Sequence, residues 1–225
     1  RRSHDIAWNS FVDSTRWHIG RETFSGISEA LDRTVETYRR DLWENQDSYL
    51  EVWVEKDAIA GIISRLAMSF GIRTFVCRGN PSLTSLFNAG STFTQAKKRG
   101  KNVRVLYFGD HDPAGATIDT RSAEILKDDF NVEVEFERVA VTPELITTMS
   151  LPTRPVKQSD RRAKDWVGGC VEVDAIPSKA LHEMLKDKIL EHIDSHAWDA
   201  LKIVEQEERM TIRQMAVMAT GEDSQ

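Results

Sequence analysis

The sequence predicts an α/β fold, a mostly parallel sheet flanked by helices. Short runs rich in β-branched and aromatic residues alternate with segments whose apolar residues recur at helical spacing. One run, Val103 to Phe108, is apolar throughout, as is typical of a strand buried on both faces. The four runs are residues 49–54, 72–77, 103–108 and 132–139, separated by expected helices at 57–70, 83–98 and 113–128. This order predicts parallel strands, because each return to the sheet requires a crossover.

Local signals support each element of this core in turn. The first helix ends at Gly71, and Ser82 or Asn80 is placed to cap the second. Pro113 suits the first turn of the third helix. In the fourth run, valine and phenylalanine alternate with glutamate, which predicts an edge strand with one solvated face.

The segments on either side of the core differ from it in composition. Apolar positions at helical spacing predict an N-terminal helix from about Ser25 to Trp43, while residues 150–168 form a polar, proline-bearing linker. Beyond the linker we expect a fifth strand at 170–175, a helix beginning near Ser178 and a last helix over 196–217. The predicted divisions are an N-terminal helical segment (1–48), the α/β core (49–141), and a linker with a C-terminal α+β extension (142–225).

Composition excludes several classes of protein. The 225 residues are 40% hydrophobic and 29% charged, as in soluble globular proteins. No apolar run approaches transmembrane length and no signal-peptide core is present, so we expect a cytoplasmic protein without a membrane partner. The net charge of −6 argues against non-specific coating of nucleic acid. Cys77 and Cys170 are expected to be buried free thiols rather than zinc ligands.

A pair of carboxylates follows the apolar strand 103–108. Asp110 and Asp112 are one residue apart, at the point where an open α/β sheet binds its ligands. Two such groups form a hard oxygen site of the kind that Mg²⁺ takes with a phosphate substrate. A simpler interpretation is a turn with an Asp helix cap, which explains one aspartate well and the second poorly.

Other charged residues end neighbouring strands at the same edge. Glu55 and Lys56 follow the first strand, and Arg78 follows the second. Glu55 could complete a Mg²⁺ or Mn²⁺ site or act as a general acid or base, while Lys56 and Arg78 could steady a phosphate. The chemistry indicated is breakage or joining of phosphodiesters, in which metal charge stabilises the displacement.

The linker carries the most basic stretch of the chain. Its cations are either a solvated surface or a flap that faces phosphates, and they comprise Arg154, Lys157, Arg161, Arg162 and Lys164. Of these, Arg161 and Arg162 are the nucleic-acid contacts that we predict.

Three of these motifs together resemble a Toprim domain, the module shared by topoisomerases, bacterial primases and some nucleases. They are Glu55-Lys56-Asp57-Ala58, Arg78-Gly79-Asn80-Pro81-Ser82 and the segment 109–115, in the order and spacing of that domain. The resemblance covers about residues 50–140. It is closest to the topoisomerase VI A subunit and the related meiotic double-strand-break proteins, in a phage or bacterial form. It implies a Rossmann-like Toprim sheet, with Glu55, Asp110 and Asp112 as the Mg²⁺-binding acids.

The sequence also departs from that family. Its members cut DNA with a tyrosine on a winged-helix domain that precedes Toprim, and we expect that domain to be lacking here. The chain begins with Arg1 rather than Met, so we expect a processed product or a piece of a longer protein. Tyr38, Tyr49 and Tyr107 lie on predicted helix stripes or strands, so none is assigned as a nucleophile. A missing N-terminal domain or a partner subunit could supply one.

Three functions stay open on the sequence. The first is a Mg²⁺-dependent enzyme that acts on DNA, either a nuclease or a topoisomerase VI A-like cleavage component. The second is a non-catalytic module that binds nucleic acid or assembles, for example as a homodimer. The third is an enzyme of small phosphoesters, although the first strand is not followed by a glycine-rich phosphate loop.

Overall fold

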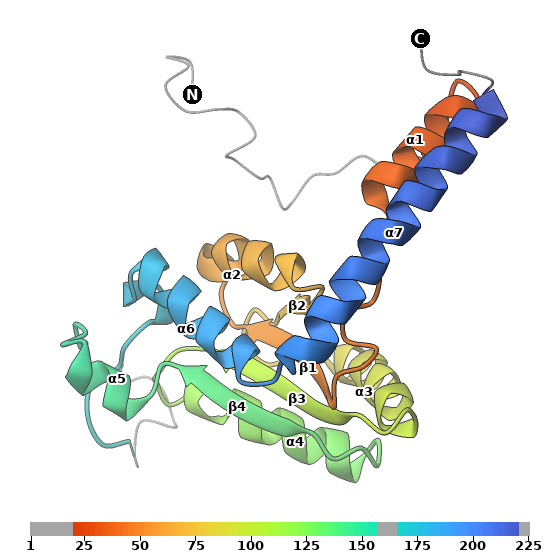
Figure 1. Cartoon of the computed structure of the whole chain (residues 1–225). Coiled ribbons are helices and arrows are strands. Elements are labelled where there is room, and N and C mark those ends of the chain that lie inside the picture. Colours follow the sequence, from red (N-terminus) through yellow and green to blue (C-terminus); the bar gives the residue numbers. More distant parts are fainter. Residues whose placement is uncertain (1–19, 157–165, 221–225) are drawn as a thin grey trace, which may run out of the picture. The chain divides into compact units, whose positions relative to one another are not determined.

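The computed structural model describes residues 20–156 and 166–220, which divide into two compact units (Figure 1). The larger unit comprises residues 40–205. The smaller one comprises 20–39 together with 206–220 within the described chain.

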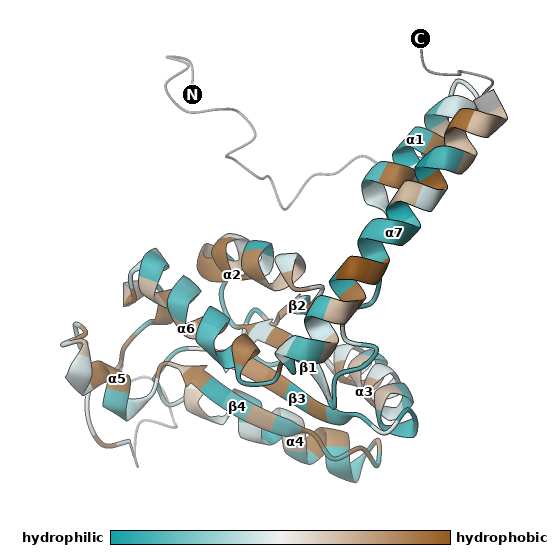
Figure 2. Cartoon of the chain, in the orientation of Figure 1, coloured by the Kyte–Doolittle hydropathy of each residue, from teal (hydrophilic) through white to brown (hydrophobic). Residues whose placement is uncertain are grey.

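The larger unit is built on a four-stranded parallel sheet, which confirms the predicted α/β class. Its strands are β1 (Ser48–Val54), β2 (Arg73–Val76), β3 (Asn102–Phe108) and β4 (Glu135–Ala140), in the order β2-β1-β3-β4. The central strand β3 is coloured mainly as hydrophobic in Figure 2, because both of its faces are covered. β4 lies at an edge of the sheet, as its alternating pattern predicted.

Helices cover both faces of this sheet. α2 (Asp57–Ser69) and α6 (Ser178–Leu190) pack with Val52, Val54 and Leu106 in one hydrophobic core. α3 (Leu83–Lys98) and α4 (Ile118–Asp128) pack with Trp53 and Tyr107 in a second core on the opposite face. Ser82 caps α3 by accepting a 3.1 Å hydrogen bond from the Ser85 N–H. A short helix, α5 (Pro143–Thr148), follows β4 and is capped by Thr142.

The chain direction across the sheet reverses between β1 and β3. From β1 the chain moves outward to β2, and then crosses back to β3 and on to β4. Open α/β sheets bind ligands at the carboxyl ends of the strands that flank such a reversal. The segments that follow β1 and β3 therefore occupy the position expected of a functional site.

Several predicted elements were wrong in detail. Residues 170–175 do not form a fifth strand: isolated antiparallel bridges at Cys170 and Val171 are followed by a 3₁₀ turn, η4 (Val173–Ala175). The helix after β3 starts later than Pro113, through the 3₁₀ turn η2 (Gly115–Thr117). β4 begins at Glu135 rather than Val132.

The smaller unit pairs α1 (Ile27–Thr37) with the C-terminal part of α7 (Ser195–Thr220). The hydroxyl of Tyr38 donates a 2.5 Å hydrogen bond to Glu208 of α7. α1 is shorter than predicted, and Trp43 is buried in the core of the larger unit instead of continuing the helix. None of the described helices combines the length and the apolar character that crossing a bilayer requires.

Candidate functional site

The carboxyl ends of β1 and β3 bring Glu55 and Asp110 into contact. The N–H of Glu55 donates to the carbonyl of Phe108 at 2.8 Å, which continues the strand pairing by one residue. The N–H of Asp110 then donates to Oε2 of Glu55, also at 2.8 Å. Two acids that are far apart in sequence thus meet where the parallel topology predicted.

Gly115 permits this close approach. A Cβ atom at this position would lie 2.7 Å from the Asp110 carbonyl oxygen and 3.0 Å from Oε2 of Glu55. Backbone carbonyls do not move aside as a flexible side chain can, so a larger residue would push the turn away from Glu55. Gly115, the last residue of the 109–115 motif, therefore has a packing role in this site.

Asp112 and Asp110 use their carboxylates differently. Oδ1 of Asp112 accepts hydrogen bonds from the N–H groups of Ala114 (2.9 Å) and Gly115 (2.6 Å), as a capping aspartate does. Asp110 is buried, and its Oδ1 accepts a 2.8 Å hydrogen bond from the N–H of Val173. The capping interpretation accounts for Asp112 Oδ1 but not for Asp110.

Lys56 lies among acids. Its Nζ is 3.0 Å from Asp110 Oδ2, 2.9 Å from Glu172 Oε2 and 3.5 Å from Asp174 Oδ1. Burial lowers the pKa of Lys56, but the bonds to Glu172 and Asp110 outweigh it, and the net pKa is raised. The ammonium group is held as an internal cation at the very carboxylate that was predicted to bind a metal.

The segment after the linker forms one wall of the site. His111 and Val171 exchange backbone hydrogen bonds of 2.9 and 3.0 Å, and Arg154 pairs with Cys170 in the same way. Arg154 also forms an ion pair with Glu172. These contacts bring Glu172 and Asp174 beside Lys56. The sequence predicted a fifth strand at 170–175 and did not assign these two acids to the site.

Arg138, near the end of β4, was missed altogether. Its guanidinium bonds both carboxylate oxygens of Asp119, at 2.9 and 3.0 Å, and the carbonyls of Gly115 (2.8 Å) and Asp110 (3.2 Å). It also lies 4.8 Å from the centre of the Tyr107 ring. Arg138 therefore ties the turn after β3 to α4. The sequence signal that could have identified Arg138 is that it is the single cation in a strand whose other charged residues are glutamates.

Burial and mutual repulsion affect the acids of the site. Burial raises the pKa of Glu55, and the charges of Asp110 and Asp112 raise it further, while hydrogen bonds from the Asp110 N–H and the Tyr107 hydroxyl oppose the rise. Burial also raises the pKa of Asp110 against the opposing effects of Val173 and Lys56. Negative charge concentrated at a partly desolvated sheet edge favours binding of a cation.

Two further residues at this edge of the sheet, Arg78 and His111, have partners outside the acids of the site. Arg78 has a positive φ of 52° and donates a 3.0 Å hydrogen bond to Asp57 at the start of α2, so it pairs with that acid. Its side chain is 62% exposed. The ring of His111 packs against Trp166, with 4.8 Å between ring centres. Arg161 and Arg162 lie outside the described residues. Cys77 is buried, as predicted, but Cys170 is only half-buried.

The donor set suits a hard divalent cation. Within residues 20–156 and 166–220, no three His, Cys, Asp or Glu side chains form a preformed metal cluster. Both oxygens of Asp110 are engaged, by the Val173 N–H and the Lys56 ammonium group, and the turn engages one oxygen of Asp112. Glu55 Oε1 and Asp112 Oδ2 accept no hydrogen bond from the described residues, and carboxylate oxygens are the ligands that Mg²⁺ prefers.

Comparison with known proteins adds no family assignment. No protein-family model matches the chain, and no curated protein matches it.

Proposed function

We propose that this chain is a Mg²⁺-dependent enzyme of the Toprim type that acts on DNA phosphodiesters. The observation that carries the proposal is the contact between Glu55 and the Asp110 N–H at the strand-order reversal of the sheet. The Asp112 carboxylate follows directly on the same turn. The motif resemblance to topoisomerase VI A subunits supports the assignment. It fits a cytoplasmic protein that acts on DNA.

Each residue of the site has a role in this proposal. Glu55, Asp110 and Asp112 would hold Mg²⁺ or Mn²⁺, and the metal would supply positive charge to the phosphate that is attacked. Arg138 holds the turn that carries the two aspartates. Glu55, with its raised pKa, is also placed to move a proton. Lys56 and the basic linker residues Arg161 and Arg162 would bind phosphates of the DNA.

A second candidate function is a non-catalytic module that binds DNA or assembles as a homodimer. The specific observation in its favour is Lys56, whose ammonium group already neutralises Asp110 at 3.0 Å. A site that supplies its own cation has less need of a metal ion. This module would bind DNA through the linker cations and would not depend on the acids.

Cleavage of supercoiled plasmid by the purified chain in Mg²⁺ or Mn²⁺ tests the first proposal. We expect nicking or linearisation that EDTA stops and that Asp110→Ala abolishes. Asp128→Ala, which removes an exposed acid of α4, is the matched control and should leave the rate unchanged. Isothermal titration with Mn²⁺ gives a readout independent of turnover, and Asp110→Ala should weaken that binding. Equal cutting by the Asp110→Ala variant would exclude the proposal.

Measurements of DNA binding separate the two candidate functions. The module predicts DNA binding that survives Asp110→Ala but falls when Arg161 and Arg162 are both changed to alanine, with a shallower dependence on salt. An affinity unchanged by the double substitution would count against the module.

A further inference from the structure

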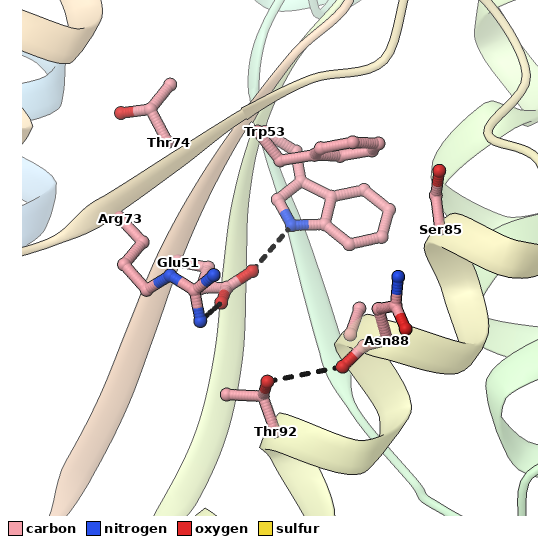
Figure 3. A pocket seen from close by; sticks show the side chains of 9 residues that line it. Glu51, Trp53, Arg73, Thr74, Ser85, Asn88 and Thr92 are labelled. Carbon is pink, nitrogen blue, oxygen red and sulfur yellow. Dashed lines mark hydrogen bonds and ion pairs between the residues drawn. The ribbon is translucent and has the colours of Figure 1, made fainter. Parts of the chain in front are cut away.

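A pocket lies between the sheet and α3, lined by side chains of β1, β2 and α3 (Figure 3). Its volume is about 280 Å³. β2 pairs with Glu51–Val54 of β1, and both strands contribute side chains to the pocket. Glu51 lies on β1 four residues before Glu55, which directly follows the strand, so the two residues are about 13 Å apart along the chain. The pocket is therefore a separate site from the one described above.

Glu51 is the buried acceptor of this pocket. Its side chain is only 7% exposed, although it carries a carboxylate. The Tyr49 hydroxyl donates to Oε1 at 2.8 Å and the Trp53 indole N–H donates to Oε2 at 3.1 Å. Arg73 lies 3.8 Å from Oε1. A carboxylate can accept about four hydrogen bonds, so Glu51 retains capacity for donors from a ligand.

The other walls are aromatic and polar. Trp53 and Phe75 pack edge to face, with 4.9 Å between ring centres, and form an apolar surface beside the carboxylate. Ser85, Asn88 and Thr92 recur at helical spacing and so line the pocket from one face of α3. The Thr92 hydroxyl is bonded to the Asn88 carbonyl, whereas the Asn88 amide has no hydrogen-bond partner among the described residues.

These walls define the chemistry of a ligand. A second cation is disfavoured because the Arg73 guanidinium already accompanies Glu51. A neutral, planar group with adjacent N–H donors suits the Glu51 carboxylate. Polar atoms at the edge of that planar group suit the Asn88 amide. The volume lies just below the range of about 300–1000 Å³ usual for small-molecule sites, which fits one heterocyclic base. Guanine presents such donors, N1–H and the 2-amino group, on its Watson–Crick edge.

We propose that this pocket binds a guanine base, with Glu51 accepting hydrogen bonds from N1–H and the 2-amino group. The base can come from a free nucleotide or from an unpaired position in a single strand, and the recognition chemistry is the same. The proposal does not depend on the metal site, so the experiments are made in EDTA.

The test compares guanosine and inosine monophosphates, which differ only in the 2-amino group, by isothermal titration against the full chain. We expect guanosine monophosphate to bind saturably and inosine monophosphate to bind about tenfold more weakly, because one donor to a buried charged acceptor is lost. Glu51→Gln should abolish the preference, and Glu124→Gln on the exposed face of α4 should preserve it.

A second arm identifies the source of the base. Short oligothymidylates with one central deoxyguanosine or deoxyinosine are compared by fluorescence anisotropy. A preference for guanine in the mononucleotides identifies a nucleotide site, and a preference in the oligonucleotides alone identifies an unpaired base in a strand; either supports the proposal. If Glu51→Gln fails to fold, Asn88→Ala, on the face of α3 that lines the pocket, should weaken binding several-fold, and unchanged binding would overturn the assignment. Absence of a guanine preference in both arms would also overturn it.

Discussion

The backbone N–H of Asp110 donates a 2.8 Å hydrogen bond to the side chain of Glu55. The carboxylate at the end of one strand thereby fixes the backbone at the start of the turn that follows its neighbour. Any change in the charge or position of Glu55 should therefore shift the turn that carries Asp110 and Asp112.

Replacement of Glu55 by glutamine should alter the pH dependence of stability. The pKa of Glu55 is raised above its ordinary value of 4.5, first by burial, so the folded protein holds this proton more tightly than the unfolded chain does. The free energy of unfolding of the parent should therefore fall as the pH rises from 4.5 through the folded-state pKa. Because glutamine does not titrate, the free energy of unfolding of Glu55→Gln should not show this fall. Urea unfolding at successive pH values should show the variant gaining stability relative to the parent, whereas Glu124→Gln should keep a constant difference.

Gly115→Ala should disrupt the site through packing alone. The new methyl group would lie 2.7 Å from the Asp110 carbonyl and 3.0 Å from Glu55 Oε2. We expect a loss of about 1–3 kcal/mol of stability, as for other overpacked sites, together with weaker Mn²⁺ binding. Gly61→Ala is the matched control. Nothing lies within 4 Å of a Cβ at that position of α2, so it should stabilise the helix by about 0.5–1 kcal/mol. Similar unfolding curves for the two variants would contradict this account.

Much of the site could be predicted because it depends on topology. The apolar run at 103–108 and the alternation of strands with helices fix a parallel sheet, and a parallel sheet brings Glu55 and Asp110 to one edge. No detailed side-chain information was needed for that step.

The contacts from outside the core could not be predicted in this way. The Val-Glu-Val-Asp alternation at 171–174 resembles a strand, but the Val173 N–H bonds the Asp110 carboxylate and the backbone turns into η4. The environment of Glu51 could not be predicted either. A lone acid among apolar strand residues suggests a solvated face, whereas this carboxylate is buried. Its partners Tyr49 and Trp53 lie two residues to either side on β1 and share its face, but the burial of that face is known only from the structure.

Arg138→Ala should destabilise the fold strongly. The Arg138 and Asp119 side chains are only 17% and 9% exposed, so the substitution leaves a buried carboxylate without its cation. Loss of one partner from such a pair costs about 3–5 kcal/mol, which urea unfolding would measure. Lys127→Ala breaks an exposed pair with Glu133 and should cost less than about 1 kcal/mol. A small effect at Arg138 would mean that the turn after β3 is held by other contacts.

Lys56→Met should separate the two candidate functions. The Lys56 ammonium lies 3.0 Å from Asp110 Oδ2 and occupies a position where a metal would bring its own charge. If the acids bind a divalent cation, removal of this competing charge should tighten Mn²⁺ binding by about tenfold, or about 1.4 kcal/mol. Lys179→Met, at a side chain that is 87% exposed on α6, should leave the affinity unchanged. Titration calorimetry measures both. Absence of Mn²⁺ binding in both the parent and Lys56→Met would mean that the acids do not form a metal site and that the ammonium group neutralises them instead. That result would favour the non-catalytic module, in which the internal cation is a permanent part of the fold.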